Sequence, residues 1–464
     1  MTNLLHIFRV RAFHLFAPLA LAATACEFNV FSPSGEPVSN ELEANAYSDT
    51  ARGGDQEVRT NALKVLAFGD SGSCNNPENP ALCKQNEVAL AMQSLCRTKG
   101  CDLGIMLGDN IYEQGVRSAD DDMFRYKYEY HYAPLKMQMY AALGNHDLWG
   151  TDISEQAQID AQVAYSALSA TWNMKSEYYD FVQGEVHFFV VSTNTFTNEQ
   201  AQWLEGRLAS SAARWKVVYG HHPIYSNGYH GDTYQLTNLL LPIVCKYASM
   251  YVAGHDHDLQ FLNPECGVPM VISGAAGKTR FSQTDPTLEN RIWSASNTYG
   301  FVRFLFDEDF FDIEFYDDKG IELFNARYNQ RYYIQLRDAA DVTTYDSQGT
   351  PPRLSALTDS IELNSESGLA NEDFWLMLRE GGLVKFRNTS TQGYISVTDD
   401  YELRTESDPT NEGIYWEFIS PQKNRLFLRN RKTGLYLIAN DDGQLVMSSE
   451  QDATFNGWKL LPPY

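Results

Sequence analysis

Basic residues are scarce in this 464-residue chain, which has 36 Lys and Arg against 60 Asp and Glu and a formal net charge of -24. A chain this acidic repels the phosphates of nucleic acids and of anionic membranes, so neither is expected as a partner of the whole protein. A small phosphate substrate stays open, because bound metal cations can reverse the field inside a site. The length and the 43% hydrophobic content predict a globular protein of two domains.

Two common signatures of metal binding and catalysis are also missing. No two of the seven cysteines stand in a C-x-x-C pair, which argues against a zinc ribbon. The chain has neither a nucleophile elbow nor a phosphatase cysteine loop, so nothing indicates a covalent phosphoenzyme.

The first 25 residues have the composition of a signal peptide. Arg9 and Arg11 precede an apolar run that ends at Ala25 and is too short for a permanent membrane-spanning helix. The next residue, Cys26, fits the lipid acceptor of a bacterial lipoprotein, although Ala23 stands where such signals prefer Leu. We therefore expect export to the cell envelope or secretion, with residues 26–60 as a flexible acidic tether.

Export places the remaining cysteines in an oxidising compartment, where disulfides form. With Cys26 set aside, an even number remains. Proximity favours the pairs Cys74–Cys83, Cys96–Cys101 and Cys245–Cys266, but six cysteines allow fifteen pairings and the sequence does not choose among them.

Residues 61–328 alternate short apolar runs with helical patterns, which predicts an α/β domain. Helices are expected over Gln85–Arg97 and Glu199–Ala213. The expected strands are Lys64–Phe68, Leu103–Leu107, Met139–Leu143, Val186–Val191, Trp215–Tyr219, Met250–Ala253 and Met270–Ile272. Ligands of α/β proteins bind beyond the carboxyl ends of strands, where loops converge.

Residues 329–464 lose the helical signal and contain a repeat of about forty residues. The segment that begins at Leu383 matches the one that begins at Leu426, and a weaker first copy begins at Tyr333. Each copy ends on a tryptophan: Trp375, Trp416 or Trp458. Three such units resemble a β-trefoil of the fascin-like or ricin-like kind, since a propeller needs more blades.

Five of the expected strands end directly in a glycine followed by polar side chains. Glycine lets the backbone turn sharply at the rim of a sheet. Each of these sequences alone is weak, but five in succession, each after a strand, are strong. They are Gly69-Asp70-Ser71-Gly72, Gly108-Asp109-Asn110-Ile111-Tyr112, Gly144-Asn145-His146-Asp147, Gly220-His221-His222-Pro223 and Gly254-His255-Asp256-His257.

These residue types supply oxygen and imidazole donors without thiolate, which suits iron, manganese or zinc. Together with Gly115-Val116 and the run to Gln260, they resemble the purple acid phosphatases of the calcineurin-like metallophosphoesterases, particularly the small tartrate-resistant type. The resemblance covers a little over half of the chain. It implies a four-layer αββα sandwich over residues 61–328, followed here by the β-trefoil.

The resemblance also implies a site for two metal ions. Asp70, Tyr112 and His257 would hold one ion, Asn145, His221 and His255 would hold the other, and Asp109 would bridge them. Tyr112 distinguishes this family from relatives that lack a tyrosine at this position. A phenolate ligand suits Fe(III) and gives a visible absorption band. The second ion would be Fe(II), Zn(II) or Mn(II).

Two further histidines are expected to take part in catalysis. His230 stands at the position of the family's proposed general acid, although it is alternatively an ordinary loop histidine. His146 is expected beside the ligands or in contact with phosphate. His222 follows a ligand and is interpreted as a rim residue.

The expected function is hydrolysis of phosphate monoesters by a hydroxide that the two metals hold. A phosphodiesterase, nucleotidase or pyrophosphatase on the same site stays open. The alternative of another class is a surface protein that binds glycans through the trefoil, with a vestigial metal site, but all seven ligand positions are filled. Three trefoil tyrosines would either stack on sugars or fill the core: Tyr394, Tyr415 and Tyr436.

Overall fold

A computed structural model describes residues 61–150, 152–262, 266–281, 291–329, 331–336, 353–356, 360–364, 371–422, 425–440, 444–449 and 457–461. The expected signal peptide, the tether and Cys26 lie outside these residues. Within them, no helix has the length and apolar character needed to cross a membrane.

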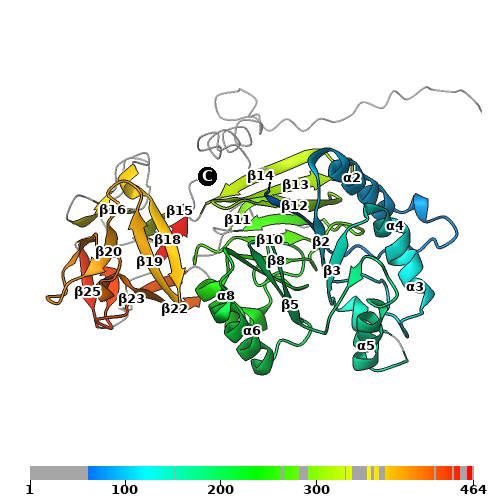
Figure 1. The fold of residues 1–464 in the computed structure, drawn as a ribbon, viewed down its shortest axis with the longest axis horizontal. Coiled ribbons are helices and arrows are strands. Elements are labelled where there is room, and N and C mark those ends of the chain that lie inside the picture. Colours follow the sequence, from blue (N-terminus) through cyan, green and yellow to red (C-terminus); the bar gives the residue numbers. More distant parts are fainter. Residues whose placement is uncertain are drawn as a thin grey trace, which may run out of the picture. The chain divides into compact units, whose positions relative to one another are not determined.

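Two seven-stranded sheets form the centre of the α/β region (Figure 1). The first has the strand order β14-β13-β12-β1-β2-β3-β4. Its strands are β1 (Leu63–Phe68), β2 (Leu103–Leu107), β3 (Gln138–Ala142), β4 (Trp172–Asn173), β12 (Gly300–Phe306), β13 (Phe311–Asp317) and β14 (Glu322–Tyr328). All seven strands expected from the sequence exist in the two sheets, with ends that differ by at most one residue.

The second sheet has the order β11-β9-β10-β8-β7-β6-β5. Its strands are β5 (Tyr179–Gln183), β6 (Val186–Val190), β7 (Trp215–Tyr219), β8 (Met250–Ala253), β9 (Leu259–Leu262), β10 (Met270–Ser273) and β11 (Arg291–Ala295). The described α-helices of this region are α2 (Lys84–Lys99), α3 (Asp122–Phe124), α4 (Tyr130–Tyr132), α5 (Glu155–Tyr165), α6 (Asn198–Ser210), α7 (Tyr234–Leu239) and α8 (Leu241–Tyr247).

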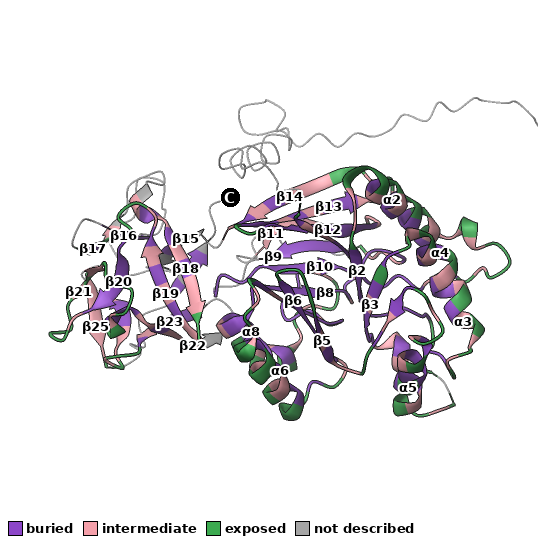
Figure 2. Cartoon of the chain, in the orientation of Figure 1, coloured by how far each residue is buried: buried purple, intermediate pink, exposed green. Residues whose placement is uncertain are grey.

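Side chains of the second sheet alternate between two hydrophobic clusters, because successive residues of a strand point to opposite faces. Phe188 on β6 and Val217 on β7 pack in a cluster with the first sheet. Their neighbours Phe189 and Val218 pack with apolar residues of α6, α7 and α8. The second sheet therefore lies between the first sheet and these helices, and Figure 2 shows β8 and β10 buried and the outer faces of α6 and α8 exposed.

The strands that carry the five glycine-led sequences are parallel to one another within each sheet. β1, β2 and β3 pair in parallel in the first sheet, and β7 pairs in parallel with β8 in the second. Their carboxyl ends therefore meet at one edge of each sheet. A side chain at Gly144 would bring its Cβ to 2.1 Å from the backbone nitrogen of Asp109, so only glycine allows the two loops to approach this closely.

Three disulfides link the pairs that proximity in the sequence favours: Cys74–Cys83, Cys96–Cys101 and Cys245–Cys266. The first holds the loop after β1 to the start of α2, and the second links the end of α2 to the residues before β2. Cross-links of this kind are typical of proteins that mature in an oxidising compartment.

The described part of the C-terminal region consists of strands and two short 3-10 helices, Asn371–Asp373 and Glu412–Ile414. Its twelve-stranded sheet returns on itself, since the last strand pairs with both β15 and β23. The strands are β15 (Arg331–Leu336), β16 (Arg353–Ala356), β17 (Ile361–Asn364), β18 (Trp375–Glu380), β19 (Leu383–Asn388), β20 (Tyr394–Val397), β21 (Leu403–Glu406), β22 (Trp416–Gln422), β23 (Arg425–Asn430), β24 (Tyr436–Ala439), β25 (Leu445–Ser448) and β26 (Trp458–Leu461).

The sequence repeat has a structural counterpart in three equivalent hydrogen bonds. The buried indole N–H groups donate to carbonyl oxygens that lie 21 residues earlier in each case. The pairs are Trp375 with Leu354, Trp416 with Ile395 and Trp458 with Leu437, at 2.9 to 3.0 Å. The three copies therefore share one core arrangement.

A buried histidine makes the stability of the α/β region depend on pH. His131 on α4 is 1% exposed, and its Nε2 has no hydrogen-bond partner among the described residues. Burial, reinforced by the charge of Lys127, lowers the pKa of His131 to about 4. The unfolded chain, with an ordinary histidine pKa of about 6.5, binds the extra proton throughout the interval between these values.

We therefore expect stability to fall as the pH drops from about 6.5 to 4, by up to about 3 kcal/mol from His131 alone. Calorimetric melting of the wild type and of His131→Gln at pH 7 and pH 4.5 tests this. The melting temperature of the wild type should fall by several degrees more than that of the variant on acidification. Equal losses would show that His131 does not contribute.

Candidate metal centre

Two buried carboxylates lie at the carboxyl ends of β1 and β2. Asp70 and Asp109 are 0% and 1% exposed, and both have left-handed backbones with φ of 55° and 51°. Such a conformation is uncommon outside glycine, and it occurs at functional loops where the surrounding structure holds it. Both residues thus lie in the loops that directly follow the parallel strands β1 and β2.

Asp70 forms one group with Tyr112 and His257. The Tyr112 hydroxyl donates to Oδ1 of Asp70 at 2.8 Å and lies 3.3 Å from Nε2 of His257. The Nε2 atom of His257 is 3.3 Å from Oδ1 of Asp70. The second oxygen of Asp70 accepts the backbone N–H of His255, which ties this group to the loop after β8.

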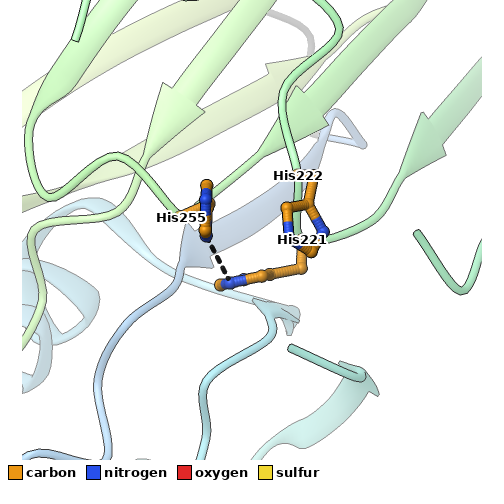
Figure 3. Close-up of side chains that lie close together, drawn as sticks. All are labelled: His221, His222 and His255. Atoms are coloured by element: carbon orange, nitrogen blue, oxygen red, sulfur yellow. Dashed lines mark hydrogen bonds between the residues drawn. The ribbon is translucent and has the colours of Figure 1, made fainter. Parts of the chain in front are cut away.

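Asn145, His221 and His255 form a second group. The Nδ1–H of His221 donates to the carbonyl oxygen of Leu107 at 2.9 Å, which leaves Nε2 as the nitrogen with the lone pair. This Nε2 lies 3.1 Å from Oδ1 of Asn145 and 3.2 Å from Nδ1 of His255. Figure 3 shows the rings of His221 and His255 turned toward one another.

Asp109 lies between the two groups. Its Oδ1 is 3.4 Å from Nε2 of His221 and accepts the backbone N–H of His146 at 2.8 Å. Donor atoms of Asp70, Asp109 and His221 all lie within 4.8 Å of one another. The structure thus brings together the seven residues that the sequence offers as candidate ligands.

The electrostatics of the cluster fit a cation site. Burial raises the pKa of Asp70 well above its ordinary value, and the charge of Asp109 adds to this. Burial also raises the pKa of Tyr112 and lowers the pKa of His221 far below its usual value. A cation would favour ionised carboxylates and neutral imidazoles here, so oxygen and nitrogen donors in this arrangement suit metal ions of the iron, zinc and manganese type.

His146 lies beside these residues. Its ring is 4.4 Å from the Tyr112 ring, and its Nδ1 is 2.9 Å from the carbonyl oxygen of Glu113. Its side chain is 17% exposed, so a substrate can reach it. The neighbouring Asp147 is fully buried and accepts hydrogen bonds from the Gly144 and Ile111 backbones, with its pKa raised by burial to about 8. Asp147 therefore organises the loops.

His230 lies against the second group, with its ring 4.3 Å from the His255 ring. Its backbone N–H donates to Oδ1 of Asp256 at 2.8 Å, which fixes the loop after β7 to the loop after β8. Arg280 donates to its Nε2 at 3.2 Å. Burial, together with the charge of Arg280, lowers the pKa of His230.

His222, interpreted from the sequence as a rim residue, lies against the second group. Its ring lies 4.3 Å from the ring of His255, and ring nitrogens of His221, His222 and His255 lie within 4.8 Å of one another (Figure 3). Burial lowers the pKa of His222 to about 4.

Two basic residues after β10 lie at the cluster although no sequence motif indicated them. Nζ of Lys278 lies 3.6 Å from the centroid of the Tyr112 ring and 2.9 Å from Oε1 of Glu113. Arg280 contacts His230 and covers the ring of Tyr229 at 4.3 Å. Both residues follow β10, a strand that pairs in parallel with β8 in the second sheet. Their position after the end of a parallel strand is the sequence feature that could have identified them.

Comparisons with known proteins agree with this geometry. The calcineurin-like phosphoesterase family model matches residues 63–259. Tartrate-resistant acid phosphatase type 5 of Homo sapiens is 32% identical over 254 residues, which cover 47% of this chain and 73% of that protein. Purple acid phosphatase 17 of Arabidopsis thaliana is 31% identical over 257 residues, which cover 50% of this chain and 76% of that protein.

The fold and the cluster of metal-binding side chains define a metallophosphoesterase, a hydrolase of phosphate esters. Within that class, the chain belongs to the family of the tartrate-resistant and purple acid phosphatases.

Proposed function

We propose that the protein is an exported phosphatase that hydrolyses phosphate monoesters with two metal ions. The observation that carries the proposal is the division of seven buried or half-buried donors into two groups with Asp109 between them. When bound, two such ions lower the pKa of a water, orient the phosphate and neutralise charge on its oxygens.

The first group would hold Fe(III), because Tyr112 supplies a hard phenolate donor beside Asp70 and His257. The second group would hold Fe(II), Zn(II) or Mn(II) through Asn145 and the two histidines. His146 would contact the phosphate, and His230 would protonate the leaving oxygen. In this proposal the domain of residues 61–328 supplies all the metal ligands and both catalytic histidines.

The location and the C-terminal region complete the proposal. Three disulfides support maturation in an oxidising compartment, with a signal peptide over residues 1–25 and a lipid on Cys26. The threefold indole hydrogen bonds support a β-trefoil over residues 329–464. Tyr394 is buried, whereas Tyr415 and Tyr436 are partly exposed and remain candidates for contact with a glycan or another surface ligand.

A comparison of two aryl esters tests the activity. We expect the purified full-length protein to hydrolyse 4-nitrophenyl phosphate much faster than bis(4-nitrophenyl) phosphate, with two metal ions per chain and a visible absorption band from the phenolate. Chelation should remove the activity and the band together. Preference for the diester would contradict the monoesterase, and a colourless, fully active zinc or manganese protein would contradict only the iron assignment.

A further inference from the structure

A cavity of about 420 Å³ opens beside the second metal group. Asn145 and His222 line it on the side of the metal centre. The other lining residues are Leu148, Trp149, Glu155, Asn194 and Thr195. The volume lies in the range of small-molecule pockets. Asn145 belongs both to this lining and to the second metal group, so a phosphate ester held at the metal centre would lie beside this cavity.

Trp149 presents an aromatic face there. Its side chain is 62% exposed, which is unusual for so large an apolar group and leaves its ring available for stacking. The backbone holds it in place, since its N–H donates to the carbonyl of His146 and its carbonyl accepts from Gly115. The ring lies 5.1 Å from that of His146.

His222 supplies an oriented hydrogen-bond donor. The hydroxyl of Thr193 accepts the backbone N–H groups of His221 and His222, at 3.2 and 2.9 Å, and lies 2.9 Å from Nδ1 of His222. With both lone pairs used, the hydroxyl donates its hydrogen to Nδ1. Neutral His222 therefore carries its proton on Nε2. The Tyr251 hydroxyl, bonded to the His222 carbonyl at 2.6 Å, fixes the residue further.

Glu155 adds a carboxylate to the lining of the cavity. It is the first residue of α5 and is exposed. Its carboxylate accepts hydrogen bonds from amino or hydroxyl donors and repels a second anionic group. An extended phosphate chain therefore fits this cavity poorly, whereas a neutral ring with N–H donors fits it well.

We propose that this cavity is the leaving-group subsite, and that it selects monoesters whose alcohol carries a planar ring with hydrogen-bond donors, as a nucleoside monophosphate does. The ring stacks on Trp149, and its donors face Glu155. His222 is a positioning residue between the cavity and the metal centre. This inference rests on the proposed monoesterase function.

The test compares kcat/KM for adenosine 5′-monophosphate with kcat/KM for methyl phosphate, which has no ring. Loss of one stacking contact to a ring corresponds to a change of about tenfold in kcat/KM. In the metal-loaded full-length protein, Trp149→Ala should lower the ratio of the two values about tenfold. Glu155→Gln should raise the rate on adenosine diphosphate relative to the monophosphate severalfold, because the repelling charge is gone.

Tyr401→Ala, which removes an aromatic side chain of similar exposure (59%) from the C-terminal region, should change neither ratio and serves as the matched control. Calorimetric melting confirms that each variant is folded. An unchanged adenosine-to-methyl ratio in Trp149→Ala would overturn the subsite while leaving the monoesterase intact. Failure of the wild type to hydrolyse either monoester would overturn both.

Discussion

Replacing Asp109 by Asn is expected to lower kcat/KM for a phosphate monoester by about a thousandfold or more. Asp109 is the one carboxylate between the two donor groups, with Oδ1 3.4 Å from Nε2 of His221. Its negative charge would offset two cations at once, and metal catalysis contributes several kcal/mol of transition-state stabilisation. The metal content should fall below two ions per chain, as measured by mass spectrometry of the purified protein.

The substitution is chosen to leave the fold in place. Asn is among the few residues that tolerate the left-handed conformation at this position, where φ is 51°. Its side-chain oxygen can still accept the backbone N–H of His146. Asp152→Asn is the matched control, because Asp152 is 77% exposed and, among the described residues, forms its ion pair with Arg117 at the surface. Full activity of Asp109→Asn with two bound metals would contradict the bridging role.

The regular part of the fold could be predicted because its physical causes are local. Apolar runs such as Leu103–Leu107 are buried on both faces of a parallel sheet, so the run itself marks the strand. The helix over Glu199–Ala213 was displaced by one residue at its start, since Thr197 caps it and accepts from Gln200. Ser211 ends it in an extended conformation, before the expected boundary.

The cluster of candidate metal ligands could be predicted because each strand end contributes a short sequence with a recognisable donor. What the sequence could not give were contacts between distant segments. Lys278 lies over the ring of Tyr112 and forms an ion pair with the next residue, Glu113, which is 165 positions away in the sequence. The role of His222 depends on Thr193, which follows a different strand. Such pairs depend on how the loops fold together, which no periodicity encodes.

Replacing His230 by Ala is expected to slow poor leaving groups far more than good ones. A general acid contributes about a hundredfold to ten-thousandfold where the leaving oxygen needs a proton, and little where it departs as a stable anion. His230 packs on the ring of His255 at 4.3 Å, close to where a phosphate ester would lie. We expect kcat for an alkyl phosphate to fall at least about a hundredfold, and kcat for 4-nitrophenyl phosphate less than about tenfold.

The two substrates separate this role from other contributions of the loop. Because Asp256 holds the backbone N–H of His230, truncating the imidazole leaves the main chain anchored. Tyr234→Ala removes an 81% exposed ring four residues away and should alter neither rate, which controls for disturbance of the segment. Equal losses on both substrates would mean that His230 binds the phosphate or supports His255. No loss on the alkyl ester would show that another group supplies the proton, and Arg280, bonded to Nε2 at 3.2 Å, would then hold His230 in a structural role.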